Sequence, residues 1–160
     1  MEQLFTDQQR TALSRHMNVA LIQASERLEA GKVPVISLLI DPKTLEIVAE
    51  SPDTSDENAL GHATMNCIAA RASMATENDY ICSGLWLVTT KEPCPMCAMA
   101  AVHSRVGAVF YSASDSDVGA LGSRFNLHLE PQLNHHYPVY RHLSGAEGQR
   151  IWHRYTCQSP

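Results

Sequence analysis

The spacing of apolar and polar positions divides the chain into helical and extended segments. Near its start, apolar residues recur at every third or fourth position, which is the period of a helix with one buried face. Thr6 and Gln9 form a capping-box pattern before this run, and Gly31 ends it. The pattern predicts a long amphipathic helix whose buried face contains Leu13, Met17, Leu21, Ala24 and Leu28.

Five short stretches have the branched and aromatic composition of β-strands. Residues 33–41 and 45–51 flank the turn sequence DPKT and therefore predict a hairpin. Residues 85–90 and 107–113 predict two further strands, and the short apolar stretch 137–141 predicts the last one. The chain therefore has enough extended segments for one sheet.

Two more helices are expected between the strands. Residues 62–74 have the helical period, and the face that it predicts contains Met65, Ile68, Ala69 and Ala72. The sequence KEPCPMCAMAAVHSRV, residues 91–106, predicts a short apolar helix with Pro95 in its first turn. Both predicted helices begin directly after a loop or a strand. In an open sheet, ligand sites commonly lie at such connections.

The C-terminal residues predict a closing helix that completes the fold. Ser144 and Glu147 have capping-box spacing, although Gly148 lowers the helix propensity. The order of helices and strands favours an α/β fold, a three-layer α/β/α sandwich with a mixed five-stranded sheet. A chain of 160 residues is long enough for one core, so we expect one domain over residues 1–160.

Composition narrows the class of protein. The chain is 44% hydrophobic and 18% charged, and it contains no run of the roughly 18 apolar residues that a membrane span needs. The start lacks a signal-peptide pattern and the cysteines are odd in number, so we expect a protein of a reducing intracellular compartment. A net charge of -5 argues against binding nucleic acid through bulk electrostatics.

Three residues have the types and spacing of a zinc site. Cys94 and Cys97 lie one helical step apart at the start of a predicted helix, where thiolates are stabilised. His62, at the start of the preceding predicted helix, supplies a third ligand and leaves a fourth position open. The alternative is that the cysteines are small buried hydrophobes, which is also the interpretation for Cys67, Cys82 and Cys157.

Thr64 occupies the position at which zinc-dependent nucleobase deaminases carry an acid. Their signature is His-x-Glu followed by Pro-Cys-x-x-Cys, whereas this chain has HAT and then PCPMC. Threonine does not transfer protons near pH 7, and losing general acid–base catalysis costs on the order of 10² to 10⁴ in rate. Glu57 and Glu92 are the carboxylates weighed as substitutes; we expect Glu57 to be solvated and Glu92 to order the local backbone.

These motifs resemble the cytidine deaminase-like superfamily, and its tRNA adenosine deaminase branch in particular. EPCPMCAMAAVHSRVGAVFY is similar to the zinc-helix region of that branch. GALGSRFNLHLEPQLNHHYPVYR is similar to the non-catalytic subunit of the eukaryotic heterodimeric tRNA wobble adenosine deaminase, which keeps the zinc ligands and replaces the glutamate. Relatives of that subunit usually carry an additional N-terminal domain implicated in tRNA capture, whereas here the first predicted helix begins close to Met1.

The resemblance implies a zinc-binding subunit without activity of its own. It implies Zn²⁺ held by His62, Cys94 and Cys97, a catalytic partner that carries the glutamate, and conversion of wobble adenosine to inosine in tRNA by the heterodimer. The zinc then has a structural role, and the apolar helix 91–106 borders a subunit interface. Two alternatives remain: an active nucleoside or nucleobase deaminase with a displaced carboxylate, and a zinc-stabilised module that binds RNA or protein outside any deaminase complex.

Basic and aromatic residues are interleaved in the tail, a composition that suits an RNA loop. Helical spacing alone also explains them as the solvated face of a closing helix, and we favour that interpretation. The candidate contacts to RNA or to the partner are His103, Arg105, Arg150, Trp152 and Arg154.

Overall fold

The computed structural model describes residues 4–74 and 80–158. Its elements, in chain order, are α1 (Asp7–Glu29), β1 (Ile36–Ile40), β2 (Ile47–Pro52), α2 (Ala63–Ala72), β3 (Trp86–Lys91), α3 (Pro95–His103), β4 (Ala108–Ala113), the 3-10 helix η1 (Leu127–Leu129), β5 (Val139–Tyr140) and α4 (Gly145–Gln158). None of the helices in the described ranges is both long and apolar enough to cross a bilayer.

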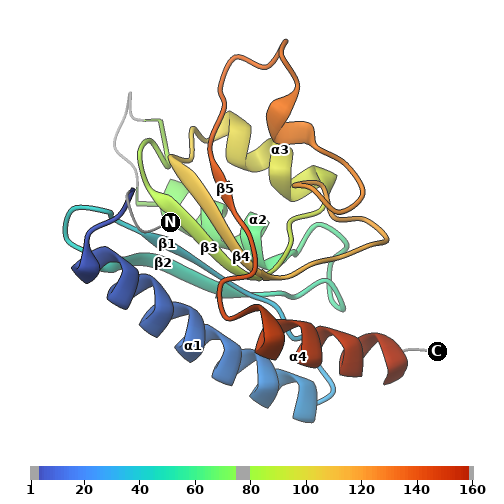
Figure 1. The fold of residues 1–160 in the computed structure, drawn as a ribbon. Helices are drawn as coiled ribbons and strands as arrows, with labels where there is room; N and C mark the ends of the chain where they lie inside the picture. Colours follow the sequence, from blue (N-terminus) through green and yellow to red (C-terminus); the bar gives the residue numbers. More distant parts are fainter. Residues whose placement is uncertain (1–3, 75–79, 159–160) are drawn as a thin grey trace.

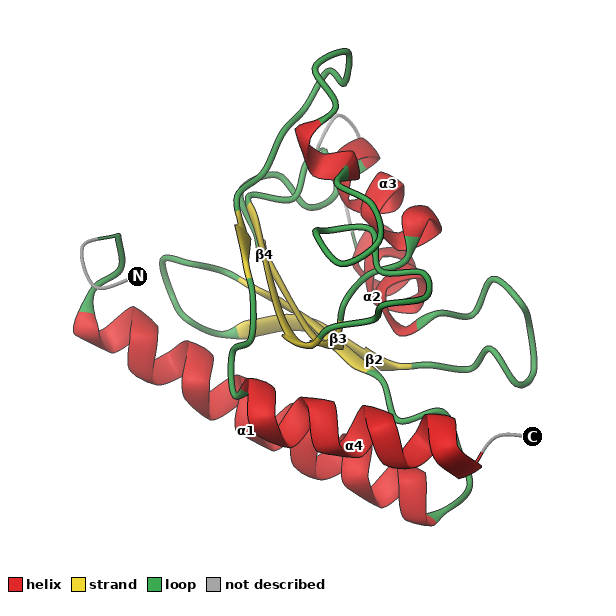
Figure 2. Ribbon diagram, turned by 45° about the vertical axis from the view of Figure 1, so that its right-hand side comes forward, coloured by secondary structure: helices red, strands yellow, loops and turns green. Residues whose placement is uncertain are grey.

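The five strands form one mixed sheet in the order β2-β1-β3-β4-β5 (Figure 1). β1 is antiparallel to both β2 and β3, while β3, β4 and β5 are parallel to one another. Helices α1 and α4 cover one face of this sheet and α2 and α3 cover the other (Figure 2). The predicted three-layer α/β/α fold with a mixed five-stranded sheet is confirmed.

The alternation of side chains along the strands builds one core on each face of the sheet. Leu38, Val88 and Phe110 pack with α1 and α4. Leu39 and Leu87, which neighbour two of these residues in sequence, point to the other face and pack with α2 and α3. Because both faces of the central strands are covered, these strands are hydrophobic throughout.

The first and third helices begin as the sequence predicts. The Thr6 side chain accepts a hydrogen bond from the Gln9 N–H, and the Gln9 side chain accepts one from the Thr6 N–H, so the capping box is present. Cys94 is the N-cap residue of α3, and Pro95 occupies the first helical position. A proline is tolerated there because its missing N–H has no partner within the helix.

Two expectations about helix surfaces are wrong. The residues of α2 that are buried are Ala63, Thr64 and Cys67, whereas Ala69, on the predicted face, is exposed. The Ser144 hydroxyl donates to Asn18 Oδ1 at 2.7 Å across the molecule, and among the described residues it accepts no hydrogen bond from an N–H group of α4.

Glycine at position 148 is needed where α4 meets the sheet. A Cβ atom there would lie 2.1 Å from Ser112 Oγ on β4, so only a residue without a side chain allows this approach. Gly148 lowers helix propensity but permits α4 to pack closely on the sheet.

Candidate metal centre

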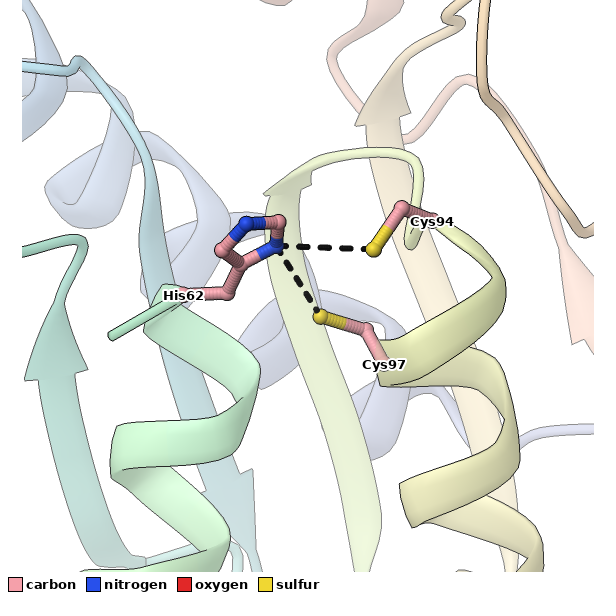
Figure 3. Close-up of side chains that lie close together, drawn as sticks. All are labelled: His62, Cys94 and Cys97. Carbon is pink, nitrogen blue, oxygen red and sulfur yellow. Dashed lines mark hydrogen bonds between the residues drawn. The ribbon is translucent and has the colours of Figure 1, made fainter. Parts of the chain in front are cut away.

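The two adjoining helix N-termini bring His62, Cys94 and Cys97 together (Figure 3). The Nδ1 atom of His62 lies 3.4 Å from Cys94 Sγ and 3.6 Å from Cys97 Sγ. In tetrahedral zinc sites, Zn–N bonds of about 2.0 Å and Zn–S bonds of about 2.3 Å place the nitrogen and sulfur about 3.5 Å apart. The three side chains therefore have the donor types and the separations that a zinc ion requires.

The start of α3 favours a thiolate at this position. The pKa of the Cys94 thiol is lowered to about 5. The largest cause is a hydrogen bond from the Cys97 thiol, and the backbone N–H groups of Cys97 and Met96 and the nearby His62 add to it. The proton that Cys97 shares with this thiolate, together with its burial, raises the pKa of Cys97. A metal ion would take the place of that shared proton, because zinc binds the deprotonated thiol.

Thr64 is buried beneath the triad, and its hydroxyl forms a hydrogen bond with a side chain of the sheet. Its Oγ1 lies 3.0 Å from Ser37 Oγ on β1, and the Ser37 hydroxyl donates to Thr89 Oγ1 on β3 at 2.9 Å. This chain of hydroxyl groups satisfies the buried polar atoms without an acid. The position next to the metal centre therefore has no side chain that exchanges protons near pH 7.

A small cavity of about 190 Å³ lies over the triad and is closed partly by α4. Trp152 and Tyr155 of α4 line it together with His62, Cys94 and Cys97. The Lys91 ammonium lies 4.5 Å from the centre of the Trp152 ring and pairs with Asp115 at 2.5 Å. Sites for drug-sized ligands usually occupy about 300–1,000 Å³, so this cavity is small for a nucleoside.

The two acids considered from the sequence are placed as expected. Glu57 is exposed in the loop before α2. Glu92 is 1% exposed and accepts hydrogen bonds from the Asp115, Leu121 and Ser123 N–H groups and from the Ser123 hydroxyl. Its oxygens hold the backbone after β4.

Sequence reasoning missed Asp53, a buried carboxylate in the cavity wall. One oxygen accepts hydrogen bonds from the Ser55 N–H and hydroxyl. The other oxygen lies 3.4 Å from the N–H of Ala63, at the start of α2. In the sequence Asp53 stands in a polar loop, and nothing there indicates a buried carboxylate. Its hydrogen bonds form only because the end of β2 meets the N-terminus of α2 in the fold.

The candidate RNA or partner contacts lie apart from one another. His103 is exposed at the end of α3, and Arg105 donates to the Asn134 carbonyl and lies 4.9 Å over the Tyr80 ring. On α4, Arg150 pairs with Glu147 and Arg154 pairs with Glu29, while Trp152 faces the cavity. The α4 cations therefore serve contacts within the chain.

The remaining cysteines divide into two kinds. Cys67 and Cys82 are buried, as expected for small apolar residues, and burial raises the pKa of Cys67 to about 12. Cys157 is exposed on α4, so the expectation that it fills the core is wrong.

Known proteins are similar to this chain in sequence and in fold. The family model described as the cytidine and deoxycytidylate deaminase zinc-binding region matches residues 10–113. The chain is 39% identical over 166 residues to a Danio rerio protein named probable inactive tRNA-specific adenosine deaminase-like protein 3, which covers 87% of this chain and 49% of the relative. It is 30% identical over 122 residues to the tRNA-specific adenosine deaminase subunit tad3 of Schizosaccharomyces pombe, which covers 69% of this chain and 39% of that protein.

A solved structure from studies of A-to-I editing by tRNA:A34 deaminases superposes with a TM-score of 0.73. It is 29% identical in sequence, and the match covers 84% of this chain and 96% of that chain. The chain spans about half the length of the inactive deaminase-like relatives that it matches. From the match over residues 10–113, the chain belongs to the cytidine and deoxycytidylate deaminase zinc-binding family.

Proposed function

We propose that this chain is a non-catalytic, zinc-binding subunit of a tRNA-specific adenosine deaminase. The observation that carries the proposal is the intact His62, Cys94 and Cys97 triad beside Thr64, whose hydroxyl is bonded to Ser37. The names of the Danio rerio and Schizosaccharomyces pombe relatives support the same assignment. In this proposal the conversion of wobble adenosine to inosine takes place on a partner subunit in the nucleus and cytoplasm.

His62, Cys94 and Cys97 would hold the zinc ion. In active deaminases of this family zinc activates a water molecule, but that chemistry also needs a glutamate to transfer protons. Here the ion would instead join the N-termini of α2 and α3, as structural zinc sites join neighbouring elements. Trp152 and Tyr155 support this role, because they leave little room for a base over the triad.

The outward faces of α2 and α3 are the proposed site for the catalytic partner. On α3, Met96, Met99 and Ala100 lie at helical spacing and are half-buried in the isolated chain, and Met65 and Ala69 lie on the adjacent α2. We call these five residues the α2–α3 face. Adjoining apolar residues that remain accessible are typical of protein interfaces.

Reconstitution tests the assignment. The chain is purified alone and with a glutamate-bearing tRNA adenosine deaminase subunit, and inosine formation is measured on tRNA with adenosine at the wobble position. We expect no activity from the chain alone, a stable complex with the partner, and activity that disappears when the partner's glutamate becomes glutamine. Activity of the chain alone would refute the proposal, and failure to associate would favour the module that acts outside a deaminase complex.

An active deaminase with a displaced carboxylate is the second candidate, because Asp53 lines the cavity. Its two oxygens accept bonds from Ser55 and from Ala63 at the start of α2, which favours a capping role. Asp53→Asn in the chain alone and in the complex separates the two functions. Loss of a measurable activity of the chain alone would support the second candidate, whereas loss of stability alone supports capping.

A further inference from the structure

A tight turn after β4 presents an exposed aromatic ring beside two arginines. Leu121 and Asn126 form an antiparallel bridge, and the Gly122 N–H donates to the Phe125 carbonyl at 2.8 Å. The N–H groups of Arg124 and Phe125 both donate to the Gly119 carbonyl at 3.0 Å. We call residues 121–126 the 121–126 turn; Arg124 and Phe125 lie near its tip, and the Phe125 side chain is 44% exposed.

The buried Glu92 carboxylate holds this turn in one conformation. One of its oxygens accepts bonds from the Leu121 and Ser123 N–H groups at 3.0 and 3.1 Å, and the other accepts the Ser123 hydroxyl. The charge of Glu92 is thereby satisfied by the turn's own donors. A surface held this way loses little conformational freedom when it binds a ligand.

Two arginines converge on the turn without a hydrogen bond or ion pair among the described residues. Arg124 belongs to the turn, and the Arg141 guanidinium lies against Gly122, where a Cβ atom would come within 2.1 Å of Arg141 Cζ. Both side chains are exposed. Of the two acids in residues 114–126, Asp115 pairs with Lys91, and Asp117 is the exposed carboxylate.

The turn adjoins both the segment before Cys94 and the helix α3, which carries part of the proposed partner site. The Ala120 N–H donates to the Pro93 carbonyl at 2.8 Å, directly before Cys94. On its other side the turn continues into η1, which packs against α3. A ligand that reaches the partner's active site across the α2–α3 face would therefore pass close to the turn.

We propose that the 121–126 turn, together with Arg141, contacts a single-stranded loop of the RNA substrate. The Phe125 ring offers a stacking surface for one base, and Arg124 and Arg141 offer guanidinium groups to the flanking phosphates. Phenylalanine and arginine also occur at protein interfaces, so the salt dependence of the affinity, which reports phosphate contacts, decides between RNA and a protein partner. The proposal rests on the proposed function, since the RNA is the substrate of the assembled complex. It places the RNA contact at this turn and not at the cations of α4.

The test uses the complex of the full chain with its catalytic partner and a fluorescent tRNA anticodon stem-loop. Affinity is measured over a series of salt concentrations for the variants R124A, R141A and F125A, with R154A as the control because Arg154 is paired with Glu29. We expect each arginine variant to lower the slope of log affinity against log salt by about 0.7, the value for one phosphate of a single strand. Loss of one stacked base in F125A is expected to weaken binding by about 5- to 150-fold.

Assembly and melting temperature are measured for every complex, so that effects on folding are separated from effects on RNA. Unchanged affinity and salt slope in R124A and R141A would overturn the proposal even if F125A were destabilised. Loss of assembly in these variants, with unchanged RNA affinity in the complex that does form, would assign the turn to the protein partner and also overturn it. If the wild-type chain does not assemble, the proposed function fails and this proposal fails with it.

Discussion

Replacing Glu92 with glutamine tests whether this acid organises the backbone beside the metal centre. The carboxylate accepts three N–H groups and one hydroxyl. A glutamine amide retains one oxygen, which can keep the Leu121 and Ser123 N–H groups. Its NH₂ group then faces the Asp115 N–H and the Ser123 hydroxyl; the hydroxyl can rotate to accept a bond, but the Asp115 N–H loses its acceptor.

The expected cost follows from these bonds. An unpaired buried N–H costs about 1–3 kcal/mol, and each remaining bond weakens by roughly 0.5–1 kcal/mol when its acceptor loses the charge. Removing a buried charge offsets part of this loss, so we expect E92Q to lower the free energy of unfolding by about 2–4 kcal/mol. In a chain of this length that corresponds to a fall in melting temperature of roughly 5–15 °C.

Thermal unfolding of the zinc-saturated chain, followed by circular dichroism, measures the effect. E57Q is the matched control, because Glu57 is exposed and its replacement is expected to leave the melting temperature unchanged. Hydrogen exchange of residues 115–123 is expected to quicken in E92Q alone. Equal melting temperatures for E92Q and wild type would refute the assignment of Glu92 as the organiser of this backbone.

Four further outcomes are expected. C97S is expected to lose bound zinc and to melt at a lower temperature, measured by elemental analysis and calorimetry; full zinc retention would contradict the ligand assignment. T64E is expected to remain inactive alone while retaining zinc, because Ser37 and Thr89 would hold the new carboxylate and the small cavity lined by Trp152 and Tyr155 leaves little room for a base; inosine formation by this variant would contradict that reasoning. Although burial raises the pKa of Asp115, the hydrogen bond and charge of Lys91 lower it below its usual range, so the pair stabilises the fold above the usual carboxyl pKa and loses that contribution as pH falls through the lowered value. K91M is therefore expected to cost on the order of 3 kcal/mol at neutral pH, and less once Asp115 is protonated, when only the contact of Lys91 with the Trp152 ring is lost; denaturant titrations at several pH values check this. A100R, on the α2–α3 face, is expected to prevent assembly with the partner in gel filtration, whereas V19R, on the opposite layer, leaves it intact.

The helices and strands of this fold could be predicted from patterns among neighbouring residues. The features that could not be predicted depend on contacts between residues far apart in the sequence. The Thr6 capping box and Pro95 at the first position of α3 depend on residues within one turn, so they could be predicted. Ser144 has the spacing of a cap, but its hydroxyl bonds to Asn18 from a different helix. The place of Asp53 in the cavity wall likewise depends on a strand end meeting a helix that begins ten residues later.

The same distinction applies to the metal centre. Spacing predicted the meeting of His62, Cys94 and Cys97, because all three lie at the starts of helices that share one face of the sheet. It did not predict that Lys91, which pairs with Asp115, lies over the Trp152 ring of α4 at the cavity. The absence of the glutamate therefore coincides with two other features: a hydroxyl network beneath the metal centre and aromatic side chains that line the space above it. A substitution at Thr64 alone changes only one of these three features. We therefore infer that the surrounding structure, as well as the missing glutamate, prevents catalysis.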